Sequence, residues 1–197
     1  MDKQLFQEIH AIFYHTSKKI GSRLALLSRL KRTLPLQSLK LLANSLVLPL
    51  FDYCSVAWSQ CPNITKEILI KQHKRMAKLI LGVDTRTPTD QVLNQLNWTT
   101  LEQRWKLHRC KLVYRALRGE APEYIAHLFQ KSNNVHNYAT RTATSNGLIV
   151  PRARTSTGKL AISHVGSLEW NELPGIVRNA VSKHAFTAQF CKTSYMY

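Results

Sequence analysis

Apolar residues recur at helical spacing through most of this chain, and proline or glycine marks where each run ends. In the first run, Ile20, Leu24 and Leu27 are spaced like one face of a helix, which predicts a helix over Ser17–Thr33. Pro35 ends that run, because proline lacks the amide proton that would continue the helix. The pattern therefore predicts a mainly α fold.

The same reasoning predicts further helices. Before residue 130 the expected ranges are Leu36–Leu48, which Pro49 kinks or ends, Asn63–Leu81, a short helix after Pro88, Leu101–Arg118 and Pro122–Phe129. Nearer the C-terminus they are Ser163–Trp170, Pro174–Ala180 and Lys183–Thr193. The core expected from these helices consists of Leu24, Leu27, Leu46, Leu48, Trp58, Ile68, Leu79, Trp105 and Leu112.

The composition of the sequence changes after residue 130. Residues 131–162 are rich in Ser, Thr and Asn and show no helical period, with one candidate strand at Leu148–Val150. We therefore expect a helical domain over 1–130, a basic linker over 131–162 and a small helical segment over 163–197.

Charge is the strongest indication of function. Lys and Arg number 28 against 11 Asp and Glu, which gives a net charge of +17. Such an excess points to a polyanionic partner, most often nucleic acid, with an anionic membrane surface as the lesser alternative. The apolar stretch Leu41–Trp58 contains Asn44, Ser45, Pro49 and Asp52, so no membrane span is predicted.

One helix carries the clearest basic stripe. Lys71, Lys74, Arg75 and Lys78 fall at i, i+3, i+4 and i+7 of the expected helix Asn63–Leu81. Like charges at this spacing repel, so the stripe is unfavourable unless a polyanion neutralises it. The alternative is an ordinary solvated face.

Two further basic groups are weaker candidates for phosphate contacts. The first, on the long helix, consists of Arg104, Lys111 and Arg115. The second lies in the acid-free segment between Glu123 and Glu169 and consists of Arg141, Arg152, Arg154 and Lys159. This segment is expected to become ordered on RNA or DNA, the alternative being a linker that is basic only in composition.

Motifs for catalysis or metal binding are missing from the sequence. It has no nucleophile elbow, no glycine-rich phosphate loop and no adjacent pair of acids for two-metal chemistry. The four cysteines show no CxxC spacing, and the histidines no ligand spacing. We expect no catalytic residue, metal or cofactor here, and a reduced intracellular location, nuclear or cytoplasmic.

Several blocks in order resemble the region downstream of the polymerase palm in reverse transcriptases of jockey-like non-LTR retrotransposons. The first is SLVLPLFDYCSVAW at 45–58, and His10, Lys19 and Ile20 are similar to the stretch that follows the last palm strand of that family. The others are RMAKLILG at 75–82, the block at 101–129, HNYATR at 136–141, PRARTSTGK at 151–159 and WNELP at 170–174. Together they span roughly residues 10–190.

The resemblance implies a thumb-like helical bundle followed by a C-terminal extension, which grips template, primer or element RNA. Its implied partners are an RNA or DNA backbone and the palm domain of a full-length polymerase. The Phe/Tyr-Ala-Asp-Asp turn of that family is absent, so no residue inherits a catalytic role and the chain looks like a non-catalytic fragment.

Two alternatives belong to other classes of protein. The first is a scaffold module whose basic faces bind acidic protein surfaces. The second is a helix-turn-helix regulator, but Arg29–Leu36 lacks the glycine that such a turn usually contains.

Overall fold

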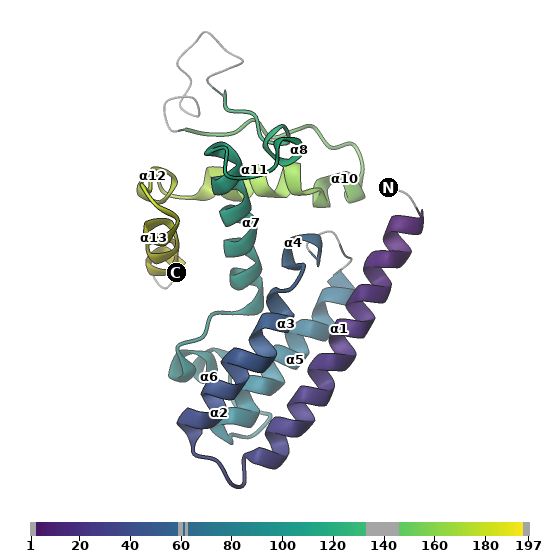
Figure 1. Ribbon diagram of the computed structural model, residues 1–197, viewed down its shortest axis with the longest axis vertical. Helices are drawn as coiled ribbons and strands as arrows, with labels where there is room; N and C mark the ends of the chain where they lie inside the picture. The colour runs from purple at the N-terminus through teal and green to yellow at the C-terminus, as the bar shows by residue number, and fades with distance from the viewer. Residues whose placement is uncertain (1–2, 59–60, 62, 133–145, 195–197) are drawn as a thin grey trace. The chain divides into compact units, whose positions relative to one another are not determined.

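A computed structural model describes residues 3–58, 61, 63–132 and 146–194, and those residues are mainly helical (Figure 1). The mainly α prediction is thus confirmed. They divide into two compact units, Met1–Arg104 and Trp105–Tyr197. The expected divisions after residues 130 and 162 both fall inside the second unit.

The first unit is a bundle of helices. In chain order it contains α1 (Lys3–Leu30), α2 (Leu36–Leu42), a π-helical turn η1 (Ala43–Val47), α3 (Leu48–Asp52), α4 (Ser55–Trp58), α5 (Asn63–Leu81), α6 (Thr89–Leu96) and the start of α7 (Leu101–Leu117). In Figure 1 the long helix α1 runs beside α5, and the two pack together.

Helix α1 begins far earlier than the expected Ser17. The apolar line continues towards the N-terminus through Phe13, but the turn between Phe13 and Ile20 is filled by Thr16, which is buried. A buried hydroxyl interrupts the apolar period that marks a helix in the sequence. The predicted start was therefore wrong by about four turns.

The chain remains helical at Pro49, but in a changed form. Proline cannot donate to the carbonyl four residues earlier, and the residues before it widen into the π turn η1 before α3 begins. The turn buries Ala43 and Val47 and leaves Leu46 exposed. The Arg23 guanidinium donates to the carbonyl of Leu46.

Two expected core residues are exposed, namely Leu46 and Ile68. Leu24, Leu27, Leu48 and Trp105 are buried as expected, Leu79 and Leu112 are half-buried, and the side chain of Trp58 lies outside the described set. On α5 the buried line runs through Leu69, Met76 and Ile80 together with the polar Thr65 and His73. Because two members of that line are polar, the sequence pattern placed Ile68 on the wrong face.

The second unit continues α7, and its described residues also form the short helices α8 (Glu123–Ala126), α10 (Ser156–Leu160), α11 (Ile162–Glu172), α12 (Gly175–Arg178) and α13 (Lys183–Ser194). The prediction was wrong for helix α10, because its residues were expected to form a loop. The hydroxyl of Thr155 accepts from the Gly158 N–H and caps this helix. Among the residues that the structure describes, the expected strand at Leu148–Val150 contributes only an isolated antiparallel bridge between Leu148 and Lys131.

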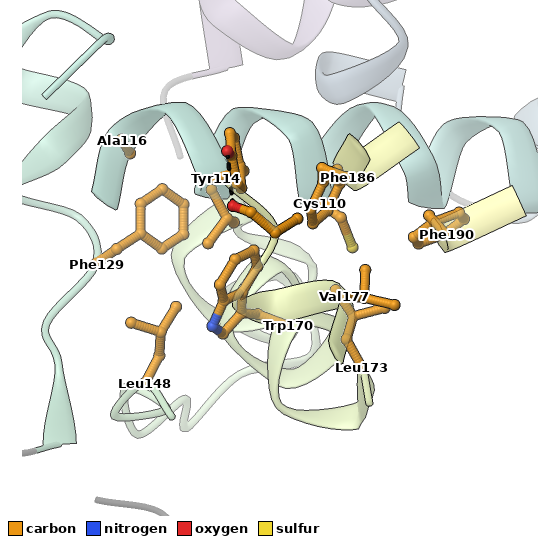
Figure 2. Packing of buried hydrophobic residues seen from close by; sticks show 12 residues of the cluster. Cys110, Tyr114, Ala116, Phe129, Leu148, Trp170, Leu173, Val177, Phe186 and Phe190 are labelled. Carbon is orange, nitrogen blue, oxygen red and sulfur yellow. Dashed lines mark hydrogen bonds between the residues drawn. The ribbon is translucent and has the colours of Figure 1, made fainter. Parts of the chain in front are cut away.

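An aromatic cluster forms the core of the second unit. Figure 2 shows the Trp170 indole in the middle of it. The rings of Trp170 and Phe186 stack with their centroids 6.0 Å apart, and the ring centroid of Tyr114 lies 4.8 Å from that of Phe186. The Tyr114 hydroxyl donates to the carbonyl of Ala180. The WNELP block thus begins with a core residue.

Candidate nucleic-acid interface

The C-terminal end of α5 is built around Gly82. This residue has a positive φ of 74°, which glycine adopts without the steric cost that other residues pay. The N–H groups of Gly82 and Val83 both donate to the Lys78 carbonyl, at 2.9 and 3.3 Å. These bonds satisfy the last turn of α5 and direct the chain into the loop that leads to α6.

A groove of about 520 Å³ lies along this end of α5. It is lined by Lys31, Lys71, Lys74, Arg75, Lys78, Leu79, Gly82, Val83, Thr85 and Thr89. All four cations of the predicted stripe therefore line one hollow, together with Lys31, residues of the α5–α6 loop and the first residue of α6.

Lys31 is a fifth cation in the groove, and the sequence did not single it out for this role. It follows the end of α1, and a Cβ placed on Gly82 would lie 2.9 Å from its Nζ atom. The end of the lysine side chain therefore lies against Gly82, where any larger residue would place its Cβ. Its position depends on the packing of α1 against α5, which no local spacing reveals.

The groove cations have few internal partners. Lys71 pairs with Glu67 at 3.5 Å, with both side chains largely exposed, so this pair contributes little. Lys78 donates from its ammonium to the Thr85 carbonyl. Lys74 and Arg75 are exposed, and among the described residues no carboxylate lies within ion-pair distance of either. A polyanion would meet cations that are not already neutralised.

One acid lies in the loop beside the groove. The Asp84 carboxylate accepts from the Arg86 N–H and the Thr85 hydroxyl, each at 3.0 Å. These two hydrogen bonds, the Arg86 bond first, lower the pKa of Asp84. The carboxylate is thus engaged by its own loop and holds that loop in a turn.

Arg104, a predicted phosphate contact, forms an ion pair within the first unit. Its guanidinium binds the Asp52 carboxylate through two bonds, Nε to Oδ1 at 2.5 Å and Nη2 to Oδ2 at 2.6 Å. A fork of this kind satisfies both groups. Arg104 therefore joins α7 to α3 inside the first unit and is not among the residues that line the groove.

The buried His73 lies on α5 next to the groove residue Lys74. Its ring centroid lies 5.5 Å from that of Phe51, in an edge-on contact, and 5.9 Å from that of Trp98. Burial, followed by the positive charge of Arg104, lowers the pKa of His73 to about 4. The imidazole is therefore neutral at pH 7 and belongs to the core.

The basic residues of α7 are largely used within the second unit. Arg109 binds Glu169 through two bonds of 2.7 and 2.5 Å, and Lys106 binds Glu172 at 2.6 Å. Arg115 is exposed and donates to the Glu120 carbonyl at 3.0 Å, while Lys111 is half-buried. The predicted α7 stripe is not a row of unengaged cations.

The third predicted group is described only in part. Arg152, Arg154 and Lys159 are exposed in the second unit, with Lys159 on α10. Arg141 lies outside the described residues. The second unit therefore presents basic side chains of its own, in addition to the groove of the first unit.

The described part of the chain offers no cluster of three His, Cys, Asp or Glu side chains that could bind a metal ion. Burial raises the pKa of the Cys110 and Cys61 thiols, which disfavours the reactive thiolate. None of the described helices combines the length and the apolar character that a membrane span requires.

The chain matches no protein-family model, no curated protein and no solved structure.

Proposed function

We propose that this chain binds the sugar-phosphate backbone of RNA or DNA through the α5 groove, without a catalytic role of its own. In a full-length polymerase of the non-LTR retrotransposon kind it would correspond to the thumb and C-terminal extension. There it would grip the template and primer or the element RNA.

One observation carries this proposal: four cations from one face of α5 and Lys31, which directly follows α1, line a single groove. Clustering of this kind costs electrostatic energy in the free protein and is relieved when phosphates bind. Because such binding releases counterions, it should be sensitive to salt and nearly independent of sequence.

The test is the salt dependence of binding to a labelled RNA or DNA. A variant with Gln at Lys71, Lys74, Arg75 and Lys78 should reduce the slope of log K against log salt by roughly 3, as expected for three or four lost phosphate contacts. The matched control replaces the exposed Lys18, Lys19, Lys183 and Lys192 by Gln, which removes the same charge elsewhere.

If both variants change the slope equally, only net charge matters and the groove has no special role. If neither changes it, the proposed function is wrong. Polyglutamate serves as a competitor for the scaffold alternative, and displacement as efficient as by RNA of equal charge would favour an acidic protein partner.

A further inference from the structure

The α5 groove is hollow, which contacts with a sugar-phosphate backbone alone do not require. Phosphates on a duplex can be met by lysines on a convex or flat surface, whereas this site is a hollow of about 520 Å³. That volume falls in the range of about 300–1,000 Å³ typical of pockets for small organic ligands.

The lining combines three kinds of group. Besides the five cations it contains the aliphatic Leu79 and Val83, both half-buried, and the hydroxyls of Thr85 and Thr89. A nucleotide carries matching groups, namely an anionic phosphate, a base with an apolar face and a sugar with hydroxyl groups. A base that is paired inside a duplex cannot present its face to Leu79 and Val83.

From this match we infer that the groove seats one unpaired nucleotide, so that the chain binds single strands more tightly than duplexes. The inference rests on the proposed function and specifies its ligand. The phosphates lie against Lys71, Lys74 and Arg75, and the base lies against Val83 and Leu79. None of the described lining residues is aromatic, so the contribution of the base is small and the ionic one dominates.

Val83→Trp tests the inference in the full-length chain, because the indole takes up the apolar part of the hollow where the base would lie and removes none of the cations. The probes are a short labelled single-stranded RNA and the blunt duplex of the same sequence. We expect single-strand affinity to fall about fivefold, the low end for one base contact, while duplex affinity stays within about twofold. The matched control is Val181→Trp, at a residue that is 82% exposed in the second unit.

A second measurement needs no variant. With wild-type protein and no divalent metal, ATP should displace the labelled single strand at a lower concentration than tripolyphosphate, because only ATP carries a base. The inference is overturned if tripolyphosphate competes as well as ATP. It is equally overturned if Val83→Trp weakens both probes alike or leaves both unchanged.

The quadruple Gln variant separates this inference from the proposed function. If that variant loses binding while Val83→Trp has no effect, the phosphate contacts stand and the nucleotide seat is wrong. If the quadruple variant binds with an unchanged salt slope, the proposed function itself fails.

Discussion

The side-chain amide of Asn171 makes two hydrogen bonds with the backbone of Leu148. Its Oδ1 atom accepts from the Leu148 N–H and its Nδ2 group donates to the Leu148 carbonyl, each at 2.8 Å. The side chain thus takes the place of a neighbouring β-strand for a residue that is itself buried. The WNELP block, in which Asn171 follows the core residue Trp170, has a structural role in the second unit.

Replacing Asn171 by Ala should destabilise the protein by about 2 kcal/mol, since it leaves a buried N–H and carbonyl without partners. Urea unfolding followed by circular dichroism measures this loss. Asn94→Ala, at an exposed position of α6, is the control and should change the free energy of unfolding by no more than about 0.5 kcal/mol. Equal effects of the two variants would contradict the strand-like role of Asn171.

Two ion pairs between α7 and α11 should differ in their contribution to stability. The Arg109–Glu169 pair is nearly buried, with side chains 10% and 14% exposed, whereas Glu172 of the second pair is 63% exposed. Glu169→Gln leaves a buried guanidinium without its countercharge and should cost about 3 kcal/mol. Glu172→Gln, the same change on the same helix, should cost less than about 1 kcal/mol. Thermal unfolding of the two variants decides the point.

Stability should fall between pH 6.5 and 4 because of His73. Its pKa is about 4 in the folded chain, against about 6.5 when unfolded, so within this window the unfolded chain binds a proton that the folded chain does not. The free energy of unfolding should therefore decrease by about 2 kcal/mol from pH 7 to pH 5.

A variant identifies His73 as the source of that decrease. His73→Leu fills the same apolar site without a titrating group and should flatten the pH dependence. His184→Gln, at an exposed residue of α13, should leave it unchanged. A wild-type decrease that persists in His73→Leu would rule His73 out as its cause.

The cysteines should differ widely in their reaction with a maleimide. Cys54 is exposed, whereas Cys110 is fully buried and burial raises the pKa of its thiol. In the native protein Cys54 should be labelled at least about a hundred times faster than Cys110, which reacts only when the chain opens. Mass spectrometry of timed digests measures both rates, and Cys54→Ser should remove the fast product.

The basic stripe on α5 could be predicted because its four members belong to one helix and local spacing places them on one face. Lys31 could not, because it reaches the groove only through the packing of α1 on α5. Arg104 has the same local appearance as the stripe residues, yet its partner Asp52 lies 52 residues away in the sequence. Charge patterning therefore identifies exposed cations only where no distant acid binds them.

The core was harder to predict where polar residues are buried. Thr16, Thr65 and His73 occupy inward positions of α1 and α5 that an apolar pattern assigns to the surface. Because these polar residues are buried, the first helix was predicted too short and Ile68 was predicted to face inward. In the second unit, Pro174 marks the start of α12 and could be recognised in the sequence. Helix α10 could not be predicted, because its residues Ser156–Leu160 show no apolar helical period.

Gly82 and Gly119 both end long helices with positive φ, yet a collection of random variants should treat them differently. Nothing lies within 4 Å of a Cβ at position 119, so asparagine, which tolerates this conformation, should be accepted there on grounds of stability alone. At position 82 the same asparagine would preserve the helix end but push the Lys31 ammonium aside. Selection for folding would then accept changes at both positions, while selection for binding would keep glycine only at position 82.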